Sequence, residues 1–190
     1  MIIWIASYPK SGNTWIRSLL STYLYSKDGN FNFSLLKKIL KFPSKKYLEY
    51  FTKDFSDIKK ISEYWIASQE RINLQNENKS IFLKTHSALC TLENNPFTNK
   101  KNTQAVIYIV RDPRNVVISQ SNHFSLSIEE STNLTINNNR SIGSNGSQTF
   151  LGSWNFNLNS WKRFKDKLLL IRYEDLVEKP EHTFLKIINF

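Results

Sequence analysis

The sequence of 190 residues predicts an α/β fold in which a central parallel sheet carries helices on both faces. Two observations lead to this prediction. Short runs of almost continuously apolar residues recur along the chain, as they do in strands that are buried on both faces. Between these runs, apolar residues recur at helical spacing, and an alternation of strands with helices is typical of a parallel sheet.

The predicted strands are the four apolar runs of the chain: Ile2 to Ala6, Ile81 to Leu83, Ala105 to Val110 and Leu168 to Ile171. Each run is nearly continuous rather than alternating, so we expect strands that lie inside the sheet with both faces covered. The run from Ile81 to Leu83 is the weakest of the four signals.

Helices are predicted between the strands. The first has apolar residues at i, i+3, i+4, i+7 and i+8, which form one helix face: Ile16, Leu19, Leu20, Tyr23 and Leu24. Similar spacings indicate a second and a third helix, in the sets Ile58, Ile61, Trp65 and Ile72, and Leu151, Trp154, Leu158, Trp161 and Lys165. Pro113 and Pro180 suit the first turn of two further helices, because no amide donor is needed there.

The segment from Ser131 to Ser147 differs from the rest of the chain. It is rich in asparagine and glycine and contains almost nothing to bury. We therefore expect a flexible polar loop over residues 131–147. Two interpretations stay open, an inert insertion and a lid that covers a bound substrate.

Basic residues outnumber acidic ones, 26 to 16, and the formal net charge is +10. Such a charge suits nucleic acid, an anionic membrane surface or a polyanionic small molecule. The chain has no arginine-rich arm and no aromatic–basic ribonucleoprotein motif, so we do not expect nucleic acid as a partner.

Three further features favour a cytoplasmic location. Cys90 is the only cysteine, which leaves no internal disulfide and no cysteine metal site. The N-terminus lacks the basic region and the longer apolar run of a signal peptide. No stretch approaches the roughly 18 apolar residues of a membrane span.

The loop from Tyr8 to Trp15, between the first predicted strand and helix, is a candidate anion site. Loops at the carboxyl ends of strands bind ligands in open α/β sheets. Gly12 lets the backbone approach an anion, and the first helical amides point toward it. Lys10 adds a positive charge, and Ser11 and Thr14 add hydroxyl groups. A tight turn capped by Thr14 is the alternative. The loop is not a Walker A motif, since Lys10 precedes Gly12.

Lys84 and His86 follow the run from Ile81 to Leu83. Residues two apart on a strand point to the same side, so both can face one pocket. Histidine titrates near neutral pH and can take a proton from a hydroxyl. A purely structural histidine at a strand end is the alternative. His123 and His182 carry no comparable signal.

Arg111 ends the third predicted strand, and Ser119 lies eight residues later, about two turns into the next helix. The guanidinium group presents a fork of donors that suits a phosphate. A surface pair of Arg111 with an acidic neighbour, beside an ordinary helix serine, is the alternative.

These segments resemble the cytosolic-type sulfotransferases, which take a sulfonate group from 3′-phosphoadenosine 5′-phosphosulfate (PAPS). Residues 8–15, Tyr-Pro-Lys-Ser-Gly-Asn-Thr-Trp, are similar to the family's phosphosulfate loop Tyr-Pro-Lys-Ser-Gly-Thr-Thr-Trp, with Asn13 in place of a threonine. Residues 84–86, Lys-Thr-His, resemble the segment that carries the family's base. The family's 3′-phosphate element likewise has an arginine followed eight residues later by a serine. Residues 152–154, Gly-Ser-Trp, and 170–176, Leu-Ile-Arg-Tyr-Glu-Asp-Leu, are two further similarities.

The resemblance implies a P-loop-like three-layer sandwich and a set of residues that hold the donor. The phosphosulfate would lie on the loop residues Lys10, Ser11, Gly12, Asn13 and Thr14. Trp15 and Tyr173 would contact the adenine, and Arg111 and Ser119 would bind the 3′-phosphate.

The resemblance also implies an in-line displacement that moves the sulfonate to a hydroxyl or amine of an acceptor. His86 would be the general base, Lys84 would help to neutralise the sulfonyl group, and Lys10 would stabilise the leaving oxygen. No metal is required by this scheme.

The similarity covers nearly all of residues 1–190, which we expect to form a single sulfotransferase-like domain. The family has a later Gly-x-x-Gly-x-Trp-Lys region, preceded by an Arg-Lys-Gly stretch that completes the 3′-phosphate site. The sequence contains no such motif. We therefore expect the domain to lack its C-terminal part and to bind the donor less tightly.

Two other functions stay open from the sequence. One is an inactive nucleotide-binding or scaffold protein derived from a sulfotransferase. The other is a P-loop-type kinase, which the missing Walker lysine disfavours. The acceptor stays open among small molecules, carbohydrates and lipids, and so does the oligomeric state.

Overall fold

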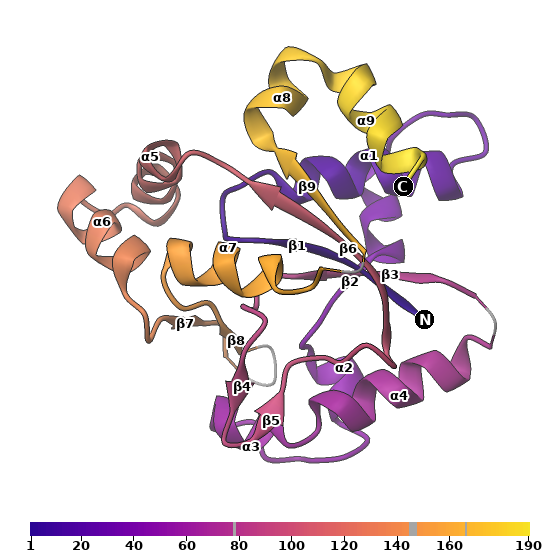
Figure 1. Cartoon of the computed structure of the whole chain (residues 1–190), viewed down its shortest axis with the longest axis vertical. Helices are drawn as coiled ribbons and strands as arrows, with labels where there is room; N and C mark the ends of the chain where they lie inside the picture. The colour runs from indigo at the N-terminus through magenta and orange to yellow at the C-terminus, as the bar shows by residue number, and fades with distance from the viewer. Residues whose placement is uncertain (78, 145–147, 166) are drawn as a thin grey trace.

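The computed structural model describes residues 1–77, 79–144, 148–165 and 167–190. Within these residues, five parallel strands form a central sheet in the order β2-β3-β1-β6-β9 (Figure 1). The strands are β1 Ile2–Ser7, β2 Leu40–Lys41, β3 Ile81–Thr85, β6 Thr103–Val110 and β9 Leu168–Arg172. The parallel sheet and the four predicted strands are thereby confirmed. Of the strands in this sheet, the sequence did not predict β2, which is too short to form an apolar run.

Helices cover both faces of this sheet, which confirms the three-layer arrangement (Figure 1). The helices that pack on one face are α1 Asn13–Tyr25, α8 Tyr173–Glu178 and α9 Pro180–Ile188. Those on the other face are α2 Lys45–Leu48, α3 Ile58–Ser62, α4 Trp65–Gln75 and α7 Trp154–Lys162. Beyond the carboxyl end of β6 lie α5 Pro113–Phe124 and α6 Ile128–Ile136. The short elements are η1 Phe33–Lys38, β4 Thr91–Leu92, β5 Asn95–Pro96, β7 Ser141–Ile142 and β8 Thr149–Phe150.

The central strand β1 supplies side chains to both cores, because successive residues of a strand point to opposite faces. Ile5 packs in the core under α1 and α9. Trp4 packs on the other face, with its ring centroid 5.3 Å from that of Phe97 and 6.5 Å from that of Trp161. Its indole nitrogen donates to Thr103 Oγ1 at 3.0 Å, so the buried polar atom is satisfied. The aromatic residues of this face therefore serve packing.

The second predicted helix is two helices in the structure. Helix α3 ends at Ser62 and α4 begins at Trp65, because Tyr64 between them leaves the helical conformation, with φ −105° and ψ 3°. Apolar periodicity could not show this break, since Ile61 before it and Trp65 after it enter the same core.

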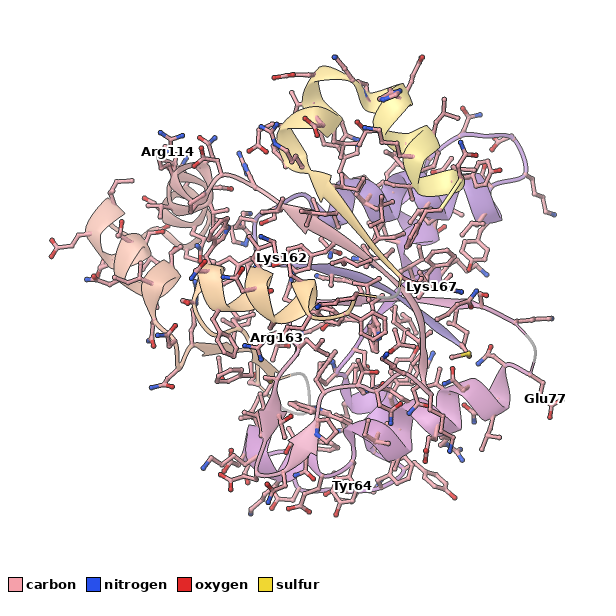
Figure 2. The ribbon with its side chains drawn as sticks, viewed as in Figure 1. Tyr64, Glu77, Arg114, Lys162, Arg163 and Lys167 are labelled. Atoms are coloured by element: carbon pink, nitrogen blue, oxygen red, sulfur yellow. The ribbon has the colours of Figure 1, made fainter. Side chains whose placement is uncertain are left out.

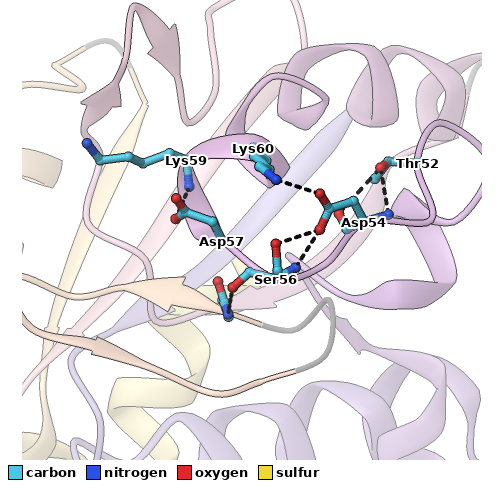
Figure 3. Close-up of polar contacts among 7 residues, drawn as sticks. Thr52, Asp54, Ser56, Asp57, Lys59 and Lys60 are labelled. Atoms are coloured by element: carbon cyan, nitrogen blue, oxygen red, sulfur yellow. Dashed lines mark hydrogen bonds and ion pairs between the residues drawn. The ribbon is translucent and has the colours of Figure 1, made fainter.

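A polar turn fixes the start of α3 (Figure 3). The carboxylate of Asp57 accepts a hydrogen bond from the Lys59 amide at 3.0 Å and caps the helix. Asp54 pairs with Lys60 at 2.7 Å and accepts from the hydroxyl of Ser56 at 2.6 Å. These contacts are exposed and lie within residues 54–60, so their role is to fix the start of α3.

The prediction of a polar loop over residues 131–147 is wrong for much of that segment. Residues 131–136 belong to α6, and residues 141–142 form β7, which pairs with β8. A capping box starts α6: Ser127 Oγ accepts from the Glu130 amide, and the Glu130 carboxylate accepts from the Ser127 amide. Residues 145–147 lie outside the described residues.

Small polar side chains attach α6 to its neighbour α5. Ser131 is buried and its hydroxyl donates to the carbonyl of Val117 at 2.7 Å. Thr135 is also buried and accepts from the Gln120 amide at 3.0 Å. A search for apolar residues could not detect this packing, which explains why the segment resembles a loop.

Basic side chains are exposed on more than one element. Figure 2 labels Arg114 on α5, Lys162 and Arg163 at the end of α7, and Lys167 just before β9, all of them exposed. None of the described helices has the length and apolar character that crossing a membrane would require.

Helix α1 offers a test of the packing, because two leucines of the same helix differ in burial. Leu20 is 2% exposed and Leu24 is 41% exposed. We expect Leu20→Ala to lower the free energy of unfolding by about 2–5 kcal/mol, through lost burial and a cavity. Leu24→Ala should change it by about 0.5 kcal/mol or less. Urea unfolding followed by circular dichroism measures both, and equal losses would contradict this packing of α1.

Candidate active site

A cavity of about 490 Å³ lies at the carboxyl ends of β1, β3, β6 and β9. Its lining contains most of the predicted site residues, from segments far apart in sequence: Lys10, Gly12, Asn13, Thr14, Trp15, His86, Arg111, Ser119 and Tyr173. Because the strands are parallel, the segments that follow them meet at this one edge. Ser11 and Lys84, also predicted, lie outside the described lining of the cavity.

The loop between β1 and α1 has the geometry of an anion site. Lys10 has φ 66° and Gly12 has φ 96°, so the backbone turns twice through the left-handed region before the helix starts. Gly12 is the N-cap of α1, and the first helical amides have no partner within the helix. Unpaired amides and the positive end of the helix dipole favour a negative group at this point.

Arg111 joins this loop to the third strand end. One terminal guanidinium nitrogen donates to the carbonyl of Lys10 at 2.9 Å. Its Nε is buried and has no hydrogen-bond partner in the part of the chain that the structure describes. A buried cationic donor without an acceptor is costly, and an anion in the cavity would remove this cost. The donor set therefore fits a phosphorylated ligand.

Tyr173, the first residue of α8, contacts other predicted site residues. The guanidinium carbon of Arg111 is 4.3 Å from the Tyr173 ring centroid. Trp15 meets the same ring edge-on, with centroids 6.0 Å apart. A Cβ added to Gly12 would come within 2.5 Å of Tyr173 Cδ2, so the ring packs directly on the glycine. The two aromatic rings and Arg111 thus form one wall of the cavity.

His86 has a defined tautomer. Its Nδ1 lies 2.7 Å from the carbonyl oxygen of Ser7. Since a carbonyl only accepts, Nδ1 must carry the proton, and Nε2 is left with a lone pair. Burial, followed by the positive charge of Lys84, lowers the pKa of His86 to about 3. The imidazole is therefore neutral at pH 7 and able to accept a proton.

Lys84 acts on the cavity from outside its lining. Burial, and then the charges of Arg17 and Lys41, lower the pKa of Lys84 to about 8. At pH 7 it is still mostly protonated, and its charge contributes to the low pKa of His86. The structure thus brings Lys84 close enough to His86 for its charge to act on the imidazole.

Asn13 lines the cavity, but both hydrogens of its side-chain amide are already used within the protein. The residue is 4% exposed. Its amide nitrogen donates to the carbonyl of Ile5 at 3.0 Å and to the hydroxyl of Ser7 at 3.1 Å. Only the backbone amide of Asn13 is left to face an anion on the loop.

Helix α7 supports the site from behind. Asn157 donates its amide hydrogens to the carbonyls of His86 at 3.0 Å and Leu151 at 2.9 Å, and it accepts from the Tyr108 hydroxyl at 2.8 Å. The indole of Trp154 donates to the Arg111 carbonyl at 3.1 Å. Sequence reasoning missed Asn157, because a polar residue inside an apolar helix face carries no signal of its partners.

His123, Phe124 and Ile142 also line the cavity and were not predicted to do so. His123 follows Ser119 by four residues on α5, so both lie on the same helix face. This spacing could have predicted that His123 lines the cavity. Ile142 belongs to β7, inside the segment that resembles a polar loop, so nothing in the sequence predicted its place in the lining.

Gly12 provides a test of the loop geometry. In Gly12→Ala, both the positive φ and the contact with Tyr173 oppose a side chain, whereas Gly29 has φ 75° with open space around it. The φ strain alone costs alanine about 1–2 kcal/mol. We expect Gly12→Ala to lose more unfolding free energy than Gly29→Ala, and the excess to disappear in the double variant with Tyr173→Ala. Equal losses in thermal unfolding would speak against the close contact.

Comparison with known proteins agrees with this geometry. Residues 2–190 match the family model of the sulfotransferase domain. A curated relative, cytosolic sulfotransferase 13 of Arabidopsis thaliana, is 25% identical over 191 residues, which cover 98% of this chain and 52% of the relative. Among solved structures, mouse sulfotransferase SULT7A1 complexed with PAP has a TM-score of 0.56 and 23% identity. The alignment covers 98% of this chain and 56% of that one.

Retinol dehydratase in a complex with retinol and PAP also has a TM-score of 0.56, with 20% identity over 99% of this chain and 59% of the other. These likenesses show the fold. The chain spans about half the length of the relatives that it matches. The match of the family model over residues 2–190 shows that the chain belongs to the sulfotransferase domain family.

Proposed function

We propose that this chain moves a sulfonate group from PAPS to a hydroxyl, or an amine, of an acceptor. The observation that carries the proposal is the neutral His86, which lines the same cavity as the anion loop and the Arg111–Ser119 pair. A base beside a phosphate-binding loop is what transfer from a phosphosulfate requires. Family membership supports the same reaction.

The cavity residues suggest how the donor is held. The 5′-phosphosulfate would lie on Lys10, Thr14 and the amides of residues 11–14, at the start of α1. Arg111 and Ser119 would bind the 3′-phosphate, the group that distinguishes PAPS from ordinary adenine nucleotides. Trp15 and Tyr173 would contact the adenine. The two relatives whose structures contain PAP, the desulfonated product, support this mode of binding.

His86 and Lys10 would carry the chemistry. Nε2 of His86 takes the proton of the acceptor hydroxyl while the acceptor oxygen forms its bond to sulfur. The bond between sulfur and the bridging oxygen breaks, and its electron pair stays on the 5′-phosphate. The ammonium group of Lys10 balances that negative charge, and the loop amides hold the anionic oxygens in position.

Electrostatics link donor binding to the strength of the base. Without a ligand, burial and Lys84 hold the pKa of His86 at about 3, which makes it a weak base. A negatively charged donor on the loop favours the protonated imidazole and so raises this pKa toward the working pH. His86 would therefore become an effective base when the donor is bound.

The acceptor would be a small molecule, a carbohydrate or a lipid. Retinol, which one structural neighbour binds, is an example of a small hydroxyl compound. Phe124 and Ile142 give the cavity an apolar side that an acceptor body could contact. We propose a cytoplasmic location, in keeping with the cytosolic Arabidopsis relative.

Binding of 3′,5′-adenosine bisphosphate, the product PAP, tests the donor site directly. We expect calorimetry without magnesium to show binding that ATP and AMP do not match. Arg111→Ala should weaken it at least tenfold, through loss of a charge-assisted contact. Arg114→Ala is the matched control, since Arg114 is exposed and paired with Asp112 at 2.5 Å. Equal weakening by both variants, or no binding to a folded wild type, would refute the proposed donor site.

Turnover tests the catalytic roles. With PAPS and a panel of phenols, alcohols, amines and sugars, we expect His86→Gln and Lys10→Ala each to lower kcat about 10²- to 10⁴-fold. Because the pKa of His86 is low in the donor-free protein, kcat/KM for the donor should hold from pH 8 down to below pH 6 and fall only as the imidazole takes a proton. His182→Gln, at an exposed position, should keep wild-type turnover. Donor binding without turnover in the wild type would identify a binding protein instead.

A further inference from the structure

A chain of hydrogen bonds connects the start of α1 to the base. The amide nitrogen of Asn13 donates to the hydroxyl of Ser7 at 3.1 Å. That hydroxyl lies 3.3 Å from Nδ1 of His86, and the carbonyl of the same serine accepts from Nδ1 at 2.7 Å. Ser7 is fully buried, so water cannot replace these partners.

The orientation of the Asn13 amide follows from its partners. Its second donor bond goes to the carbonyl of Ile5 at 3.0 Å, and a carbonyl cannot donate. The nitrogen must therefore face Ile5 and Ser7, which lie two residues apart on one face of β1. Asn13 thus holds the C-terminal end of β1 at two points, next to His86.

We propose that Asn13 is a positioning residue for His86 rather than a side-chain ligand of the donor. By holding the Ser7 hydroxyl and, two residues earlier, the Ile5 carbonyl, it would keep the end of β1 in place and so aim Nε2 into the cavity. Asn13 is also the first residue of α1, where the proposed donor phosphosulfate binds. One residue then links the donor loop to the base. This inference rests on the proposed function.

The family pattern has a threonine where this chain has Asn13, and the two residue types differ in the number of hydrogen bonds that they can donate to β1. A threonine hydroxyl supplies one hydrogen, whereas the amide supplies two and uses both on β1. An alanine at this position would leave the Ser7 hydroxyl free to rotate beside the imidazole. A misaimed base slows proton transfer without removing any phosphate contact.

Two measurements on Asn13→Ala separate the two roles. We expect kcat at saturating donor to fall about tenfold or more, and the Kd for PAP to change less than about threefold. Thr14→Ala is the contrast, because Thr14 is exposed and lines the cavity, and it should weaken PAP binding instead. A tenfold loss of PAP affinity in Asn13→Ala with kcat retained would overturn the proposal and make Asn13 a donor ligand.

A double-mutant cycle tests the path through Ser7. If Asn13 acts on His86 through Ser7, then Ser7→Ala should lower kcat similarly, and the double variant should be no worse than either single one. Additive losses would mean that the two residues act separately and would contradict the proposal. If Asn13→Ala does not fold, Asn13→Leu, which has a similar size and no donor hydrogens, should show the same kcat defect.

A third readout does not depend on turnover, so it separates this inference from the proposed function. The chain has three histidines, and the Nδ1 proton of His86 can be assigned by NMR with His86→Gln. Its hydrogen bond to a buried carbonyl should protect it from exchange in the wild type. We expect exchange to become at least tenfold faster in Asn13→Ala. Unchanged protection would overturn the positioning role, even if the wild type has no activity.

Discussion

The parallel pairing of β1 with both β3 and β6 is the constraint on which the site depends. It directs the carboxyl ends of three strands to one edge, so the loop after β1, His86 after β3 and Arg111 after β6 meet there. Pairing of β6 with β9 adds Tyr173 at the same edge. None of these segments is near the others in sequence. The cavity therefore depends on the pairing of the strands and not on any one motif.

Much of this could be read from the sequence, and the exceptions share a physical cause. Apolar runs mark strands buried on both faces, which is why four of the five central strands were found and the short β2 was not. The α5–α6 contact was not predicted because it includes hydrogen-bonded polar side chains such as Ser131 and Thr135. Asn157 was not predicted either, because the sequence does not show which polar groups it contacts. The spacing of Lys84 from His86 predicted a shared face but could not show that Lys84 stays outside the cavity lining.

The low pKa values of Lys84 and His86 connect the site to stability. In both cases the unfolded chain binds protons more readily than the folded one, so stability is lost as pH falls. For Lys84 the loss runs from about pH 10.5 down to about 8, and for His86 from about 6.5 down to about 3. At pH 7 the folded protein therefore already bears the cost of a protonated, largely buried Lys84 beside His86.

The contact between Tyr173 and Gly12 has a consequence for the chain during its synthesis. The loop of residues 8–15 leaves the ribosome well before Tyr173, whose ring packs on Gly12 and which follows only after β9. Domains generally fold as units, and this cavity has no complete wall until that ring has been made. A nascent chain therefore carries the loop sequence before the cavity exists. Ligand capture would mark a polypeptide in which Tyr173 has already packed on Gly12.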